Sequence, residues 1–162
     1  MKNLRRNLKD QRGFNLIELM IVIAIIALLI GVGVPAWQSM VRAGNETTAA
    51  QTIGTIRTCQ ISYSGKHQGK FATNFAELVR SGCIEGDKFT AEPPVINGYI
   101  FSMKVTEPSG TSPAFYSINV DPQVNSGIQA TGNRCFYYDS TLGTVKSAEE
   151  SGCPATPTSP SM

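Results

Sequence analysis

The chain has 162 residues and a formal net charge of +2, from 14 basic and 12 acidic side chains. Five of the basic residues and one acid lie within residues 1–13, so the remainder carries nine basic and eleven acidic side chains. The positive net charge is therefore no argument for nucleic-acid binding, and no nucleic-acid partner is predicted. About 120 residues follow the apolar N-terminal segment, which is sufficient for one modest domain.

An apolar segment follows the basic N-terminus. Residues 19–41 contain no charged side chain. As a helix with a rise of ~1.5 Å per residue they extend ~35 Å, enough to cross a hydrocarbon core of ~30 Å. The preceding charges keep the N-terminus in the cytoplasm; they are Lys2, Arg5, Arg6, Lys9 and Arg12, with Asp10 as the one acid. We therefore predict a single-pass anchor with the rest of the chain exported.

Glu18 lies at the start of this segment, within the first turn or two of the expected helix. A carboxylate costs ~2.5 to 3.5 kcal/mol at the membrane centre and less near an end, so it usually indicates a cationic partner. A secretory signal cleaved near Pro35 is an alternative interpretation, but it leaves Glu18 without a role. An incidental acid at the membrane boundary is another.

Arg12, Gly13 and Phe14 precede Glu18, which is the fifth residue counted from Phe14. This pattern resembles the processing signal of type IV pilins and the related pseudopilins. The resemblance implies that a membrane-embedded prepilin peptidase cuts between Gly13 and Phe14 and methylates the new amino terminus. It also implies that the Phe14 ammonium of one subunit pairs with Glu18 of a neighbour, because an unpaired charge is costly in a low-dielectric bundle.

Residues 31–35, with the sequence Gly-Val-Gly-Val-Pro, form the weakest turn of the expected helix. The two glycines lower its helix propensity, and Pro35 lacks the N–H that would bond to Gly31. A simple kink is one interpretation. Pilins have a proline at the corresponding distance from the cut, and this resemblance implies a segment that melts or stretches during assembly.

Residues 42–65 predict that the helix continues into solvent as an amphipathic half. Positions on one face recur at steps of three and four, and they are Ala49, Ile53, Ile56, Gln60 and Tyr63. Gly44, Gly54 and several threonines weaken this helix, so its apolar stripe needs a packing partner. The whole helix, from Phe14 to Tyr63, would be ~75 Å long.

Residues 66–153 predict a small globular head. A short helix is expected at residues 74–82, with Asn74 as its N-cap and Gly82 as its stop. Four β-strands are expected, at residues 99–105, 115–120, 134–138 and 144–146. The fold class is therefore α+β, with the long N-terminal helix packed on a small antiparallel sheet. Residues 154–162 are rich in Pro, Ser and Thr and are expected to form a flexible tail.

All four cysteines lie in the exported part, where disulfides persist. Three pairings are open. Sequence proximity favours Cys59–Cys83 and Cys135–Cys153 by a small entropic margin, since shorter loops close at lower cost. The second pair also matches the pilin habit of tying down a C-terminal loop. A zinc site is the competing interpretation, although the cysteines lack the short spacing of zinc ligands.

Patterns typical of catalysis are missing from the sequence. His67 is the only histidine and lies in a loop with glycines, where a solvated residue is the simpler interpretation. Asp139, Glu149 and Glu150 resemble a pseudopilin calcium set, but their spacing does not fit an EF-hand and a solvated acidic cluster is simpler. The aromatic residues of the expected strands are interpreted as core and cross-strand pairs. We predict neither an enzyme nor a metal or other cofactor.

The resemblance to pilins implies a structural function. The chain would be a type IV pilus subunit, held first in a bacterial inner membrane and then assembled into an extracellular homo-oligomeric filament. Its expected partners are the prepilin peptidase, the inner-membrane pilus assembly machinery and other copies of itself. A pseudopilin of a type II secretion system and a membrane-tethered binding domain are the alternatives. Cell adhesion, motility and DNA capture are roles of the family, and nothing in this sequence selects adhesion or DNA capture.

Overall fold

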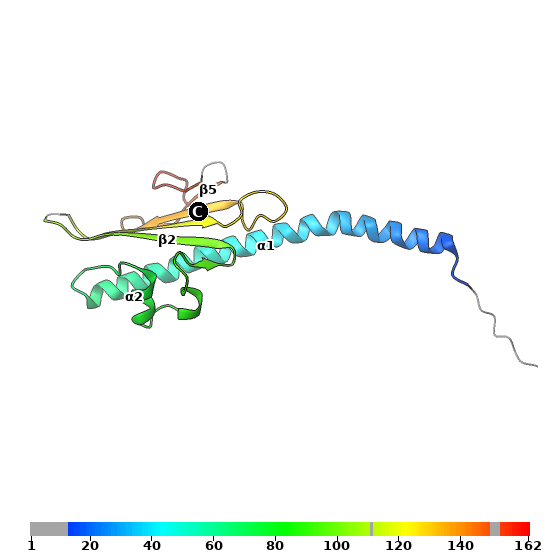
Figure 1. Ribbon diagram of the computed structural model, residues 1–162. Coiled ribbons are helices and arrows are strands. Elements are labelled where there is room, and N and C mark those ends of the chain that lie inside the picture. The colour runs from blue at the N-terminus through cyan, green and yellow to red at the C-terminus, as the bar shows by residue number, and fades with distance from the viewer. Residues whose placement is uncertain (1–12, 111, 150–152) are drawn as a thin grey trace, which may run out of the picture. The chain divides into compact units, whose positions relative to one another are not determined.

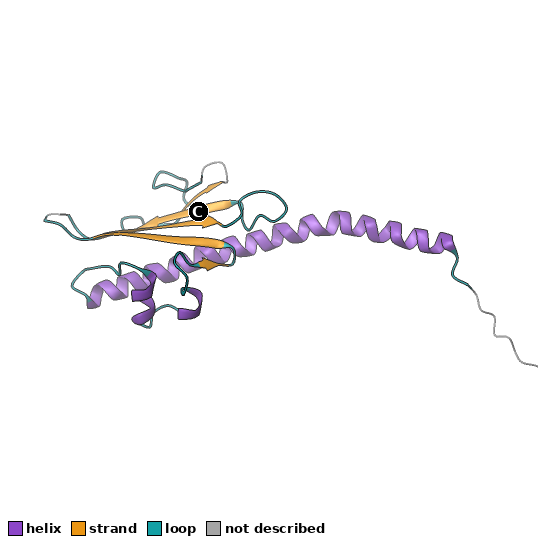
Figure 2. Ribbon diagram, viewed as in Figure 1, coloured by secondary structure: helices purple, strands orange, loops and turns teal. Residues whose placement is uncertain are grey.

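The computed structural model describes residues 13–110, 112–149 and 153–162. The basic leader, residues 1–12, and Glu150 therefore lie outside the described residues. The chain divides into two compact units, Met1–Trp37 and Gln38–Met162. Figures 1 and 2 show the elements of each unit, and the helix α1 (Leu16–Lys66) contributes to both.

The described part of the first unit is the N-terminal half of α1. Asn15 caps this helix, because its side-chain oxygen accepts a hydrogen bond from the Ile17 N–H at 3.2 Å and its carbonyl accepts from the Glu18 N–H at 3.0 Å. The helix therefore begins just after the cap rather than at Phe14. It continues through Pro35 without interruption, and the large apolar side chains of this half are 45% or more exposed.

In the second unit, α1 lies along one face of an antiparallel sheet, and the C-terminal segment lies on the other face (Figure 1). The described strands follow one another in space as in sequence: β1 (Val95–Ile96), β2 (Tyr99–Thr106), β3 (Phe115–Pro122), β4 (Arg134–Asp139) and β5 (Lys146–Glu149). In the central strands, Met103 is opposite Ile118 and Ile118 is opposite Tyr138. This meander confirms the expected α+β fold.

The predicted apolar stripe of α1 is the part of the helix that packs on the sheet. Ile53 and Ile56 are fully buried there. They share one cluster with the inward-facing residues of the strands, which are Tyr99, Phe101, Tyr116, Ile118, Val120, Phe136 and Tyr138. Because alternate residues of a strand face opposite sides, these side chains fill a single face of the sheet. The helix and the sheet therefore bury each other's apolar surface.

Gln60 is the polar member of the buried stripe. Its side chain donates to the Ala72 carbonyl and accepts from the Ala72 N–H, each at 2.9 Å. One side chain thus supplies both hydrogen bonds that a neighbouring strand would supply to this buried residue. The loop after α1 is docked by this pair, and α2 (Phe75–Arg80) and the 3₁₀ helix η1 (Gly86–Lys88) follow it. Asn74 is the expected N-cap of α2 and accepts from the Glu77 N–H at 2.9 Å.

The last strand differs from the expectation. It begins at Lys146 rather than at Thr144. The reason lies in the preceding turn, where the Asp139 carboxylate accepts from the Thr141 N–H at 2.8 Å and from the Leu142 N–H at 3.0 Å. These bonds extend the turn, so pairing with β4 starts further along the chain.

The prediction also omits β1. This strand forms a hairpin with β2 through Asn97 and Gly98, whose φ angles are 48° and 76°. Asn-Gly is the strongest short signal for a two-residue hairpin turn with left-handed backbone. The information was therefore present in the sequence.

The C-terminal residues pack along β5. The Ser147 N–H donates to the Pro160 carbonyl at 2.9 Å, and the Met162 N–H donates to the Val145 carbonyl at 3.1 Å. Ala155 is buried against the outer face of the sheet, at 2% exposure. The segment that was expected to be a flexible tail therefore covers the outer edge of the sheet.

Candidate functional site

The expected processing site lies directly before α1. Gly13 and Phe14 are in extended or irregular backbone, and the Phe14 side chain is 85% exposed. A Cβ atom at Gly13 would meet nothing within 4 Å, so packing within the described chain does not require glycine there. Both residues that flank the expected cut are exposed among the described residues.

Glu18 lies in the first turn of α1 with an exposed side chain. The N-terminus of a helix favours an acid, because its free N–H groups carry partial positive charge. Among the residues that the structure describes, no ion pair involves the Glu18 carboxylate. A cation from another molecule can therefore approach it.

The weakened turn at residues 31–35 is also open. A Cβ atom at Gly31 or Gly33 would meet nothing within 4 Å. Glycines that are not needed for packing inside one chain allow a second helix to approach closely. Pro35 lies inside the helix and removes one backbone donor from the same region.

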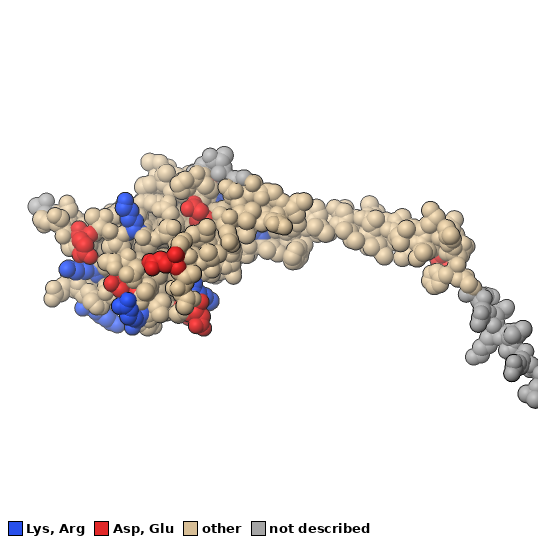
Figure 3. Space-filling model, in the orientation of Figure 1, with Lys and Arg blue, Asp and Glu red and all other residues tan. Residues whose placement is uncertain are grey.

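Charged side chains gather on the second unit. Figure 3 shows acids and bases interspersed on the visible face of that unit, whereas residues 19–41 of α1 carry no charge. Within the described residues, α1 is the one helix long and apolar enough to cross a membrane, and none of its apolar window is buried. Such a surface is covered either by lipid or by other apolar helices.

Both expected disulfides are present. Cys59 pairs with Cys83 at a Cα–Cα distance of 5.6 Å, and Cys135 pairs with Cys153 at 5.7 Å. The first joins α1 to the residues after α2, and the second joins β4 to the residues after β5. Because no cysteine is left as a thiol, the zinc interpretation is wrong.

The acids of the candidate calcium set have other roles. Asp139 is 3% exposed, and its carboxylate accepts hydrogen bonds from the turn that follows it. Burial raises the pKa of Asp139, but these bonds and one from the Tyr137 hydroxyl outweigh it, so the net pKa is lowered. Glu149 lies 3.7 Å from Arg134, and Glu150 lies outside the described residues. Asp139 is therefore a structural cap.

One further cluster has metal-ligand residue types. Asp121 lies within 4.8 Å of the sulfurs of Cys135 and Cys153. The two sulfurs form a disulfide and do not act as thiolate ligands. Burial raises the pKa of Asp121. These three residues therefore form part of the packed outer face of the sheet and not a metal site.

His67 is exposed at the end of α1. Its ring stacks on Tyr63 with centroids 3.8 Å apart, and its Nδ1 lies 2.9 Å from the Tyr63 carbonyl. The described contacts of this histidine are thus with the helix that precedes it. They give it a local structural role at the helix end.

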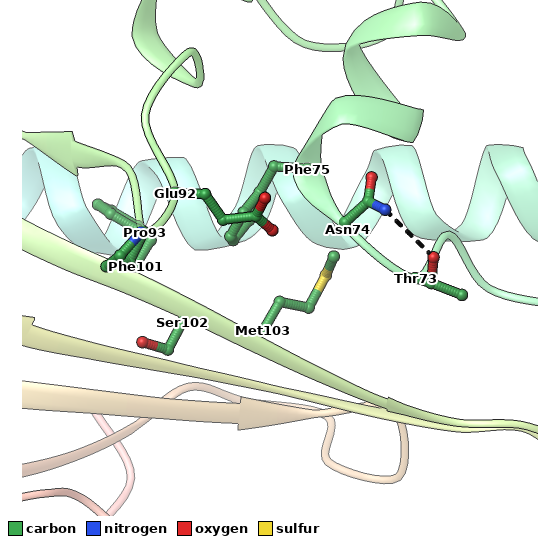
Figure 4. A pocket seen from close by; sticks show the side chains of 8 residues that line it. All are labelled: Thr73, Asn74, Phe75, Glu92, Pro93, Phe101, Ser102 and Met103. Atoms are coloured by element: carbon green, nitrogen blue, oxygen red, sulfur yellow. Dashed lines mark hydrogen bonds between the residues drawn. The ribbon is translucent and has the colours of Figure 1, made fainter.

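A cavity of about 280 Å³ opens between β2 and the loop before α2 (Figure 4). Its described lining is Thr73, Asn74, Phe75, Glu92, Pro93, Phe101, Ser102 and Met103. Glu92 is the one ionisable residue in this lining, and Asn74 already caps α2. The lining therefore offers no acid–base pair for catalysis.

A polar network that sequence reasoning missed joins α1 to the connection between β3 and β4, residues 123–133, here called the β3–β4 loop. The Arg42 guanidinium donates to the Gly127 carbonyl at 2.7 Å and to the Asn133 side-chain oxygen at 3.4 Å. Gly127 and Asn133 lie 85 and 91 positions after Arg42 in the sequence. No local pattern could have predicted their contact.

The same loop is held by the next turn of α1. The Asn45 amide donates to the Thr131 carbonyl at 2.9 Å, and the Glu46 carboxylate accepts from the Asn133 N–H at 2.8 Å. Backbone groups of the loop are thus satisfied by side chains of one helix face. The loop is thus fixed to residues 42–46 of α1, which directly follow the uncharged residues 19–41.

One family model and several known proteins match part of the chain. Residues 8–34, which include Gly13, Phe14 and Glu18, match the family model of the prokaryotic N-terminal methylation motif. Prepilin peptidase-dependent protein D of Escherichia coli (strain K12) is 46% identical over 59 residues, 34% of this chain and 40% of that protein. Type IV major fimbrial protein FimA of Dichelobacter nodosus is 35% identical over 83 residues, 50% of this chain and 51% of that protein. A fimbrial protein of Pseudomonas aeruginosa is 39% identical over 51 residues, 32% of this chain and 33% of that protein.

The chain spans about half the length, or less, of the curated relatives it matches. No solved structure gives a significant match. The methylation motif and the exposed apolar helix fit a membrane-anchored precursor with a prepilin-type N-terminus. The matches to fimbrial proteins and the α+β fold support a similarity to type IV pilins. These relatives point to a structural protein.

Proposed function

We propose that the chain is a structural subunit of a type IV pilus. It is made as a precursor anchored in a bacterial inner membrane, cut by a prepilin peptidase between Gly13 and Phe14, and moved by the assembly machinery into an extracellular filament. The main support is the exposed apolar half of α1 with the methylation motif at its start. Lipid covers this half in the precursor, and the same helices of other subunits cover it in the filament.

Phe14 and Glu18 set the register between subunits in this proposal. Cutting after Gly13 gives Phe14 a positively charged amino terminus. When two helices pack in a dry bundle, a shift of register would leave this ammonium and a Glu18 carboxylate both buried and unpaired. Removing the partner of a buried charge costs several kcal/mol, roughly 3–5. The pairing therefore selects one alignment of neighbouring helices.

The weakened turn at residues 31–35 has a role in the same process. Its glycines allow close approach of a neighbouring helix, and Pro35 lowers the cost of opening the local hydrogen bonds. The helix can adjust there while the second unit, held by its own core and two disulfides, keeps its fold.

Two measurements test the proposal. Mass analysis of the chain from cell membranes should find a mature protein that begins at methylated Phe14. Antibodies against the second unit should label surface filaments in electron micrographs. A retained Met1 would indicate a plain membrane tether, and a processed chain confined to the periplasm would indicate a pseudopilin.

A further inference from the structure

The β3–β4 loop combines two unusual properties. Residues 123–133 contain no charged side chain, although charges are interspersed over the second unit (Figure 3). Ile128 in this loop is 77% exposed, more than any other large hydrophobic side chain described beyond Val41. A single exposed isoleucine is unremarkable on a protein surface. Its place in a charge-free and tightly fixed loop requires a physical explanation.

The loop is fixed by internal hydrogen bonds. The Thr131 N–H donates to the Val124 carbonyl at 2.8 Å, and the Thr131 hydroxyl donates to the Gly98 carbonyl at 2.7 Å. Gly127 has a φ of 82°, a left-handed conformation that glycine adopts without strain and that turns the chain directly before Ile128. The apolar side chain is therefore presented by an ordered turn.

The loop is also fixed to a defined place on α1. Arg42, which binds the Gly127 carbonyl at 2.7 Å, is the first charged residue after residues 19–41. In a spanning helix the first charge after the apolar run lies at the boundary between hydrocarbon and water. With residues 19–41 taken as the span, the loop bound to Arg42 lies near that boundary.

We propose that the β3–β4 loop rests on the outer surface of the lipid bilayer while the subunit is a membrane-anchored precursor, with Ile128 in the interfacial region. The proposal rests on the proposed function in taking residues 14–41 as the membrane span. A charge-free loop loses no charge hydration on contact with the interface, and Ile128 leaves water. Arg42 lies beside it, with its stem in the apolar layer and its guanidinium among headgroups and loop carbonyls.

Lipid fits this surface better than a second copy of the chain does. The depth of the loop follows from Arg42 of the same molecule, so every anchored monomer places the loop at the interface before it meets a neighbour. The contact orients the second unit on the membrane and is broken when the subunit is lifted into a filament. Lifting the subunit out of the bilayer must therefore break this contact, which adds a free-energy cost at the loop.

Tryptophan fluorescence of the mature full-length chain in vesicles of phosphatidylethanolamine and phosphatidylglycerol tests the proposal. Trp37 is the only tryptophan, so a Trp37→Phe chain can carry a single probe as Ile128→Trp. The matched control is Ile61→Trp, because Ile61 is also exposed, at 58%, but lies ~28 Å further along the helix from Arg42. Near-UV circular dichroism of the tyrosines checks the fold, and Gln129→Trp provides a second probe in the loop.

The proposal expects emission from position 128 at shorter wavelength than from position 61, with several-fold stronger quenching by lipids brominated on their acyl chains. Equal quenching at positions 128, 129 and 61 would overturn it. Protection of position 128 that develops only in assembled filaments would assign the loop to a neighbouring subunit and would also overturn it. Alkaline carbonate extraction separates the two levels: a chain released by carbonate refutes the membrane span itself, whereas a retained chain with an unquenched loop refutes the loop contact alone.

Discussion

Replacing Gln60 with Met keeps the length of the side chain but removes both hydrogen bonds to Ala72. Gln60 and Ala72 are both at 0% exposure, so water does not replace the lost partner. A buried polar group left unpaired costs ~1–3 kcal/mol, and two such groups should lower the free energy of unfolding by ~2–6 kcal/mol. This is a large part of the ~5–15 kcal/mol that stabilises a typical domain.

Urea unfolding of the mature chain in detergent micelles, followed by near-UV circular dichroism of the buried tyrosines, measures this loss. Gln51→Met is the matched control, because Gln51 is on the same helix with an exposed side chain. Its stability should stay within ~0.5 kcal/mol of the parent chain. If Gln60→Met and Gln51→Met unfolded at the same urea concentration, the account of the docked loop would be wrong.

Three further predictions concern the interface, the disulfides and the pH dependence. Glu18→Ala should leave membrane insertion and processing intact but abolish filaments, which immunoblots and electron microscopy check; normal filaments would contradict the pairing. Replacing Cys59 and Cys83 together by Ala should lower the free energy of unfolding by ~2–5 kcal/mol in urea titrations. Because the pKa of Asp139 is lowered in the folded state, its contribution is present above the ordinary value of ~3.9 and is lost as pH falls through the lowered value. The stability gap between the parent chain and Asp139→Asn should therefore shrink in acid; a constant gap would argue against this role.

Local patterns predicted most of the fold. The stripe from Ala49 to Tyr63 follows helical spacing, and Tyr99, Phe101 and Met103 alternate as a half-buried strand does. Both patterns depend on residues a few positions apart, where the periodicity of the chain is visible in the sequence. The same holds for the processing motif, whose residues lie within one short segment matched by the methylation family.

Long-range contacts could not be predicted in this way. The start of β5 depends on how Asp139 organises its turn, and the β3–β4 loop depends on Arg42, Asn45 and Glu46 reaching across the fold. Such pairings depend on tertiary geometry, which cannot be read from the local pattern of a single sequence. The absence of charge in the β3–β4 loop is visible in the sequence. The place of this loop beside Arg42 is not, because it depends on the tertiary contact with α1.

The tail along β5 has a consequence for crowded subunits. A sheet that ends in an unpaired strand can recruit a strand from another molecule and so start aggregation. Here the bonds of residues 145–147 to Pro160 and Met162 occupy that position. If the chain is concentrated before assembly as proposed, these bonds hinder strand pairing between copies at this edge of the sheet. A version shortened before residue 155 should therefore precipitate more readily.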